Sequence, residues 1–231
     1  MAGNDDGPRF ASVVLDVDST LSGIEGIDWL AALRGGNVRD RIAALTTQAM
    51  AGEIALDAIY AERLEAIRPT RDELAALGEA YIAQRAEGAQ RAIASMRAAG
   101  VRVVIVSGGI REAILPLAEL LGIDETDVHA VSVACDSRGE YAGFERASVL
   151  ATQGGKPLLV RLLGLPAPVL AVGDGSTDLA IRTAGACDAF AAYTGFAARA
   201  PVVDAADIRV ASFAQLLEIV LTGHAANETG R

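Results

Sequence analysis

The sequence predicts an α/β fold, a doubly wound parallel sheet with an inserted helical cap domain. Apolar runs of strand length occur at residues 11–15, 101–106 and 169–172, and segments with helical periodicity lie between them. This alternation is typical of a parallel sheet. The chain between the first two runs is much longer than a usual strand-to-helix connection, which predicts an insertion there.

Composition limits the function. The chain has 231 residues, 52% of them hydrophobic, which is enough for a full core. Its net charge of −10 makes a nucleic acid or an anionic membrane an improbable partner. It has no apolar run long enough to span a membrane, and residues 1–9 do not resemble a secretory signal. We therefore expect a cytoplasmic protein.

The insertion is predicted to be helical. Apolar residues recur at helical spacing in residues 26–33, 38–50, 54–67 and 71–83, and Pro69 with Thr70 marks a helix stop and a new N-cap. We assign residues 21–85 to a cap and residues 1–20 and 86–231 to the core, with 1–9 and 224–231 loose.

The remaining core elements are predicted from the same patterns. A helix at residues 89–98 leads back into the sheet, where Ser107-Gly108-Gly109 ends the second strand. The other expected elements are helices at 110–121, 157–163 and 213–221, a helix that follows the stretch 173–178 and ends near residue 184, a β-ribbon at 128–144, and short strands at 189–191 and 208–210. The carboxyl ends of parallel strands are the usual place for a ligand.

Two carboxylates follow the first strand. Asp16 and Asp18 lie where the backbone leaves the sheet, and burying such charges is costly without a cation or donor. A hard-metal site is one interpretation. A strand-ending turn is the other, since Asp and Ser are common turn residues, and the pentapeptide alone leaves the two about even.

Other polar residues follow the other predicted strand ends. Ser107 precedes Gly108 and Gly109, whose backbone can approach an anion closely. Asp174 and Asp178 lie in Gly-Asp-Gly-Ser-Thr-Asp after the third apolar run, and Gly-Gly-Lys opens a helix. Each motif has an ordinary structural explanation as a turn, a helix start, or an N-cap formed by Ser176 or Thr177. Four such coincidences at strand ends are improbable.

The scarce residue types narrow the chemistry. His129 and His224 are the only histidines, and neither lies beside a nucleophile or at metal-ligand spacing. Cys135 and Cys187 have no CxxC spacing, so a thiolate metal site is not indicated. Lys156 is the only lysine among 20 basic residues, which suggests either a need for a compact charge or chance in an arginine-rich chain.

The candidate residues suit a phosphate held between a metal ion and a lysine. Asp16, Asp18 and Asp174 offer the oxygen ligands that Mg²⁺ prefers. Without a suitable histidine or cysteine, a carboxylate is the plausible nucleophile and would form an aspartyl-phosphate. The second carboxylate would protonate the leaving oxygen and then deprotonate water.

These motifs resemble those of the haloacid dehalogenase superfamily, most closely its L-phosphoserine phosphatases. The superfamily pattern of Asp-x-Asp-x-Thr, a strand-end Ser, a Lys and Gly-Asp-Gly-x-x-Asp is present in order. The similarity extends from about residue 11 to 222 and includes the cap, with Glu-Gly-Ile-Asp at 25–28, Ala-Met at 49–50, Glu-Arg-Leu at 62–64 and the stretch 139–144. It implies a Rossmann-like core.

The resemblance also implies roles. Asp16 would be the nucleophile and a Mg²⁺ ligand, Asp18 the general acid/base and a ligand through its carbonyl, and Asp174 the third ligand. Asp178 would support these ligands. The remaining substrate-binding residues would be Glu25, Met50, Arg63, Ser107, Gly108, Gly109, Lys156 and Thr177.

Three of these roles depend on the resemblance. Glu25 and Arg63 would bind the ammonium and carboxylate of the serine moiety, which suits their opposite charges, and Met50 would pack against it. From the residues alone, Glu25 is interpreted as an acidic residue in the first turn of a helix, Arg63 as a solvated charge on a helix face, and Met50 as a side chain that fills the core. Ala51 and Ser22-Gly23 depart from relatives near the cap mouth.

The motifs predict a Mg²⁺-dependent phosphomonoesterase, and the resemblance implies that it converts O-phospho-L-serine to L-serine in the last step of serine biosynthesis. One alternative is a phosphatase or phosphotransferase for another small phosphomonoester, such as phosphohomoserine or phosphoethanolamine. An alternative of another class is a non-catalytic phosphoamino-acid-binding protein. We expect a monomer or homodimer.

Overall fold

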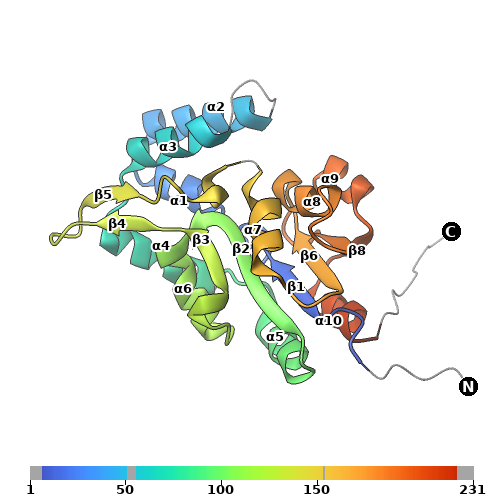
Figure 1. Cartoon of the computed structure of the whole chain (residues 1–231). Helices are drawn as coiled ribbons and strands as arrows, with labels where there is room; N and C mark the ends of the chain where they lie inside the picture. Colours follow the sequence, from blue (N-terminus) through green and yellow to red (C-terminus); the bar gives the residue numbers. More distant parts are fainter. Residues whose placement is uncertain (1–6, 51–55, 153, 223–231) are drawn as a thin grey trace, which may run out of the picture.

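A computed structural model describes residues 7–50, 56–152 and 154–222 of the chain (Figure 1). For residues 43, 46–50 and 56–58 the description is limited to the backbone. Residues 1–6 and 223–231 lie outside the described residues, and they include most of the two ends predicted to be loose, 1–9 and 224–231.

A parallel sheet forms the core. Within the described residues it has six strands in the order β3-β2-β1-β6-β7-β8. They are β1 (Ser12–Leu15), β2 (Arg102–Ile110), β3 (Val128–Val131), β6 (Val169–Gly173), β7 (Ala189–Tyr193) and β8 (Ile208–Val210). The predicted doubly wound fold is confirmed.

The central strand β1 has neighbours on both sides. Val13 lies opposite Val103 of β2 and Leu170 of β6, and all three are buried. Burial of such side chains contributes about 1.5–3 kcal/mol each. This explains why the central strands read as uninterrupted apolar runs.

The order of the strands places the ligand-binding crevice. From β1 the chain proceeds to β2 and β3 on one side, whereas β6, β7 and β8 follow in turn on the other. The direction therefore reverses between β1 and β6, which is the point where open α/β sheets bind ligands. Asp16 and Asp174 directly follow these two strands.

Helices cover both faces of the sheet (Figure 1). Those of the core are α5 (Ala89–Ala98), α6 (Arg111–Leu120), α7 (Gly155–Leu163), α8 (Ser176–Thr183), α9 (Ala200–Ala205) and α10 (Phe213–Thr222). Helix α5 packs against α10, and α7 packs against α8. Single 3₁₀ turns at Glu125–Asp127 and Val149–Ala151 complete the connections.

Four helices follow β1 in the predicted insertion. They are α1 (Gly26–Ala32), α2 (Gly36–Met50), α3 (Leu56–Ile67) and α4 (Arg71–Ala83). Helices α2 and α3 lie together at the top of Figure 1, whereas α4 packs against α6 of the core. Thr70 caps α4 through a reciprocal capping box with Glu73, which confirms the predicted N-cap.

The two connections between these helices and the sheet are bonded to each other. The backbone N–H of Gly23 donates to the carbonyl of Gln84 at 3.0 Å, and that of Ala86 donates to Leu21 at 2.8 Å. The Ser22 hydroxyl also donates to Gln84 at 3.2 Å. Entry to and exit from the helical insertion therefore form one hydrogen-bonded junction.

Several predicted element boundaries were wrong. Strand β2 does not end at Ser107-Gly108-Gly109, as expected, but continues to Ile110, with a shift in its register to β3 after Val106. Residues 128–131 belong to the main sheet, and the ribbon consists of β4 (Val133–Cys135) and β5 (Tyr141–Phe144) alone. Periodicity cannot separate these short strands, because their partners are chosen by tertiary contacts.

Helix α9 was not predicted. It has six residues, and Val202 is its one buried side chain. Such a short helix has no apolar periodicity to detect. None of the described helices is long and apolar enough to cross a membrane.

One guanidinium connects three helices of the insertion. Arg34, just after α1, donates to both carboxylate oxygens of Glu73 in α4 at 2.5 Å. Its Nε also donates to the carbonyl of Ile67 at the end of α3, at 2.6 Å. The Arg34 and Glu73 side chains are 23% and 24% exposed, so this ion pair is shielded from much of the solvent.

We predict that Arg34→Met lowers the free energy of unfolding by about 1–3 kcal/mol, because it removes charge-assisted bonds and leaves Glu73 without its cation. Urea unfolding followed by circular dichroism measures the difference. Arg39→Met is the control, since Arg39 is 65% exposed in its pair with Asp40, and its effect should stay within about 0.5 kcal/mol.

The difference in the free energy of unfolding between wild type and Arg34→Met should depend on pH. The bonds from Arg34 hold the pKa of Glu73 below its usual value of 4.5. A lowered pKa in the folded state stabilises the protein above the unfolded pKa, and this contribution disappears as the pH falls through the folded value. The gap between wild type and Arg34→Met should therefore narrow below about pH 4.5. A constant gap down to pH 3 would contradict this assignment.

Candidate active site

A cavity of about 520 Å³ opens at the carboxyl edge of β1 and β6. Eleven of the twelve predicted site residues line it, namely Asp16, Asp18, Glu25, Arg63, Ser107, Gly108, Gly109, Lys156, Asp174, Thr177 and Asp178. The twelfth is Met50, whose side chain lies outside the described part of the chain. The structure thus brings together residues that span more than 160 positions of sequence.

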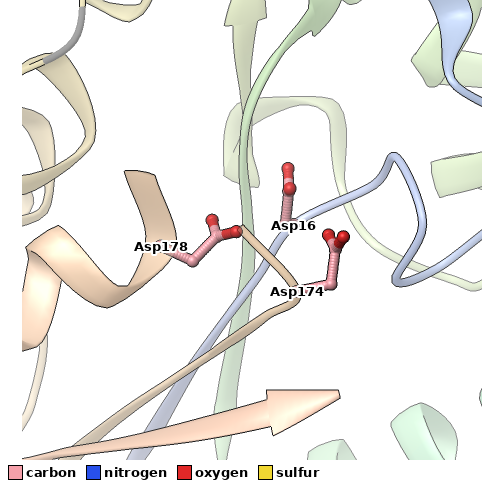
Figure 2. Close-up of side chains that lie close together, drawn as sticks. All are labelled: Asp16, Asp174 and Asp178. Atoms are coloured by element: carbon pink, nitrogen blue, oxygen red, sulfur yellow. The ribbon is translucent and has the colours of Figure 1, made fainter. Parts of the chain in front are cut away.

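Three buried carboxylates converge at this edge (Figure 2). Asp16 follows β1, Asp174 follows β6, and Asp178 lies in the first turn of α8. One oxygen of each lies within 4.8 Å of the others. Like charges this close repel unless cations lie among them. A set of converging carboxylate oxygens fits a hard divalent cation, and the predicted ligands Asp16 and Asp174 both belong to it.

Glycines allow Asp178 to approach the strand end. A Cβ on Gly173 would lie 2.2 Å from the Asp178 carboxyl carbon, so a side chain cannot be accommodated there. The Asp178 carboxylate accepts a hydrogen bond from the Gly175 N–H at 3.0 Å. Gly175 is the N-cap of α8, so the alternative explanation of this motif, an N-cap formed by Ser176 or Thr177, was wrong. Instead, the side chain of Asp178, three residues after Gly175, accepts a hydrogen bond from the N–H at the start of this helix.

Lys156 supplies a positive charge between two of the carboxylates. It is the second residue of α7 and is 6% exposed. Its Nζ lies 2.9 Å from Asp16 Oδ1 and 2.6 Å from Asp178 Oδ1. Burial alone would lower the pKa of Lys156, but Asp16 and Asp178 outweigh it and hold that pKa above its usual value. The ammonium therefore stays charged.

A close backbone contact holds the N-terminus of α7 in place. A Cβ on Gly155 would lie 1.7 Å from the carbonyl oxygen of Val149. Only glycine therefore permits this approach of α7 to the preceding 3₁₀ turn. The contact places Lys156, the next residue, in the cavity.

The end of β2 forms another wall. The buried Ser107 hydroxyl accepts a hydrogen bond from the Gly109 N–H at 3.1 Å, and both residues line the cavity with Gly108. A Cβ on Gly109 would lie 3.1 Å from Ile114 and 3.3 Å from the Ser107 hydroxyl oxygen. The absence of a side chain here keeps the hydroxyl within reach of a ligand.

Asp18 is held by two donors. The Tyr81 hydroxyl donates to Oδ1 at 2.5 Å, and the Gly26 N–H donates to Oδ2 at 3.2 Å. Burial, followed by the charges of Glu25 and Asp16, raises the pKa of Asp18 to about 7. A carboxyl group with such a pKa can exchange a proton near neutral pH.

The residues expected to bind an amino-acid moiety are paired with opposite charges of this chain. Glu25 accepts hydrogen bonds from the Ser19 hydroxyl at 2.7 Å and from Arg199 at 3.2 Å. Arg63 donates to Asp28 at 2.7 Å. Both pairs lie at the cavity.

Arg199 and Tyr81 were missed by the sequence interpretation. The Arg199 guanidinium contacts the carboxylate of Asp174 as well as that of Glu25. It is one of nineteen arginines and has no motif around it, so nothing in the sequence singles it out. Tyr81 has the spacing of an ordinary buried residue of α4.

Apolar side chains complete the cavity. They come from the helical insertion, from the 3₁₀ turn at Val149–Ala151 and from α9, and they include Ile27, Ile59, Tyr60, Leu150 and Val202. A cavity of about 520 Å³ with an apolar wall and several polar groups suits a small molecule. Its charged end, at the sheet edge, suits an anion held by Lys156 and a metal ion.

Comparisons with known proteins agree with this fold and site. Residues 13–181 match the haloacid dehalogenase-like hydrolase family. Phosphoserine phosphatases of Bos taurus and Homo sapiens are 33% and 32% identical over 209 residues, which cover 89% of this chain and 91% of each relative. A solved phosphoserine phosphohydrolase-like protein from Francisella tularensis superposes with a TM-score of 0.80 at 22% identity, covering 90% of this chain and 99% of that one. The chain therefore belongs to the haloacid dehalogenase-like hydrolase family and, within it, to the phosphoserine phosphatase family.

Proposed function

We propose that this chain hydrolyses O-phospho-L-serine to L-serine and phosphate through an aspartyl-phosphate, as the last step of serine biosynthesis. One observation carries the proposal. Asp16 lies beside a buried ammonium at the sheet edge, and the same cavity contains Glu25 and Arg63, whose charges suit an amino acid. The relatives, which carry this activity in their names, match the chain through the insertion as well as the core.

In the proposed reaction the Asp16 carboxylate attacks phosphorus. The bond from phosphorus to the serine oxygen breaks, and Asp18 protonates that oxygen as it leaves. Asp18 then accepts a proton from the water that attacks the aspartyl-phosphate. The products are free Asp16 and inorganic phosphate, and Asp18 is protonated again for the next cycle.

Other residues bind the phosphoryl group in this proposal. Lys156 contacts Asp16 and is placed to neutralise charge that develops on the phosphoryl oxygens. The Ser107 hydroxyl, Thr177 and the backbone of Gly108 and Gly109 line the same region and would orient those oxygens. Fixed donors of this kind need little reorganisation during the reaction.

We further propose Mg²⁺ as the cofactor. The Asp16 and Asp174 carboxylates and the Asp18 carbonyl would hold it, and Asp178 would keep Lys156 and the start of α8 in place around it. Bound there, the ion would withdraw electron density from the phosphoryl oxygens. Asp174 would then exchange its contact with Arg199 for the ion.

Glu25 and Arg63 would set the substrate, with Met50 as an apolar contact. In the proposal Glu25 binds the ammonium and Arg63 binds the carboxylate, so that Arg63 leaves Asp28 when the substrate enters. The proposed location is the cytoplasm, and the proposed form is a monomer or homodimer. Neither nucleic acid nor membrane is proposed as a partner, in line with the net charge of −10.

The nucleophile is tested with Asp16→Asn. The amide cannot attack phosphorus, so we expect turnover of phosphoserine to fall by about 10³-fold or more, measured as phosphate release. Asp124→Asn is the control, because Asp124 is 70% exposed in its pair with Arg97 and lies outside the cavity. Normal turnover in a folded Asp16→Asn protein would end the proposed mechanism.

Metal dependence is a separate prediction. Protein dialysed against EDTA should be inactive, and Mg²⁺ should restore activity with saturation. Asp174→Asn should require about tenfold more Mg²⁺ for half-maximal recovery, since it removes one anionic ligand. Binding should also raise the melting temperature of the dialysed wild type. Full turnover in EDTA would contradict the Mg²⁺ assignment.

Substrate choice is tested with Arg63→Met. We expect kcat/KM for phosphoserine to fall by about 10- to 100-fold, mostly through KM, because a charge-assisted contact with the carboxylate is lost. Phosphoethanolamine has no carboxylate, and its kcat/KM should change little. Arg41→Met is the control, since Arg41 is 61% exposed in its pair with Glu62. Equal losses for both substrates would exclude carboxylate recognition by Arg63.

A further inference from the structure

Tyr81, a residue of the helical insertion, contacts the side chain of Asp18. It lies near the C-terminal end of α4, the last helix of the insertion, and its side chain is 0% exposed. Its hydroxyl donates to Asp18 Oδ1 at 2.5 Å. A hydroxyl-to-carboxylate bond of this length is among the strong hydrogen bonds of proteins.

The surroundings fix this hydroxyl in place. A Cβ on Gly26 would lie 2.1 Å from the Tyr81 oxygen, so the glycine at the start of α1 makes room for it. A Cβ on Gly109 would lie 3.6 Å from the same oxygen. Helix α4, which carries Tyr81, packs on α6 of the core. Asp18 thus has one well-defined donor on Oδ1.

We propose that Tyr81 is a positioning residue, which holds the Asp18 carboxyl group in the orientation for proton transfer to the leaving oxygen. The inference rests on the proposed function, in which Asp18 is the general acid. The competing explanation is structural, since a buried tyrosine hydroxyl needs a partner and Asp18 satisfies it. The two explanations predict different effects of the leaving group on the activity of a variant that lacks the Tyr81 hydroxyl.

Substrates with different leaving groups can distinguish a catalytic defect from a loss of folded enzyme. Serine leaves as a strongly basic oxygen and needs a proton from Asp18, whereas p-nitrophenolate and acetate are weak bases that leave without one. The value of kcat/KM reports the steps through aspartyl-phosphate formation. A misplaced Asp18 should therefore slow phosphoserine but not p-nitrophenyl phosphate or acetyl phosphate. A smaller fraction of folded enzyme would slow all three equally.

We expect Tyr81→Phe to lower kcat/KM for phosphoserine by about tenfold, the value of one hydrogen bond to a charged group. The effect should appear in kcat, with KM changed less than about twofold, because Tyr81 does not touch the substrate. For p-nitrophenyl phosphate and acetyl phosphate, kcat/KM should change less than about twofold. The ratio between substrates in one preparation does not depend on the fraction of active protein.

Two further variants complete the experiment. Tyr141→Phe is the matched control, because Tyr141 is also buried, lies outside the cavity, and finds no hydrogen-bond partner for its hydroxyl among the described residues. It should leave the substrate ratio unchanged. Gly26→Ala must displace the Tyr81 hydroxyl and should shift the ratio in the same direction, which provides a second test if Tyr81→Phe folds poorly.

The outcomes are distinct. Equal losses for all three substrates in Tyr81→Phe and Gly26→Ala would overturn the positioning role and leave Tyr81 as a structural residue. Unchanged kinetics for phosphoserine in both variants would overturn it as well. Failure of the proposed function would appear earlier, as a wild-type protein that does not release phosphate from phosphoserine.

Discussion

The contact of Lys156 with Asp16 and Asp178 is the interaction on which the rest of the site depends. Three carboxylates buried within 4.8 Å of one another would be unstable without compensating charge. The ammonium lies 2.9 and 2.6 Å from two of them, and a compact charge on a flexible stem can reach both. Close backbone approaches at Gly155 and Gly173 make this arrangement possible. Gly155 and Gly173 thus allow the charged side chains of the site to lie close together.

Much of this arrangement was predictable, because each principal residue follows directly on a short apolar strand or opens a helix. Asp16 and Asp174 directly follow β1 and β6, which are hydrogen-bonded neighbours. Once the strands were recognised, parallel topology required their carboxyl ends to lie on one edge. The local sequence was therefore enough to predict where the candidate nucleophile and the acidic cluster lie in the fold. The capping of α8 by Asp178 was not foreseen, since Ser176 and Thr177 are equally good local candidates.

The partners of these residues were not predictable in the same way. Asp28 lies in the stretch 25–28, but its pairing with Arg63 depends on how α1 packs on α3. Tyr81, which contacts Asp18, and Arg199, which lines the cavity, come from parts of the sequence far from the motifs. Their sequence surroundings are those of ordinary helical or loop residues. The assignment of residues 128–131 to the ribbon failed for the same reason, because strand pairing is a tertiary choice. Single-sequence patterns specify which residues can act, whereas the fold specifies what orients them.

The paired charges at the cavity affect how selectivity would arise under the proposed function. Before a ligand enters, Glu25 is bonded to Arg199, and Arg63 is bonded to Asp28. A ligand with an ammonium and a carboxylate would exchange both ion pairs for its own, so its gain is a difference between pairs and not a full ion-pair energy. A ligand without a carboxylate would leave Arg63 paired with Asp28 at no desolvation cost. Discrimination must then come from better geometry and deeper burial of the new pair, because Asp28 is 47% exposed and its bond to Arg63 is partly screened by water.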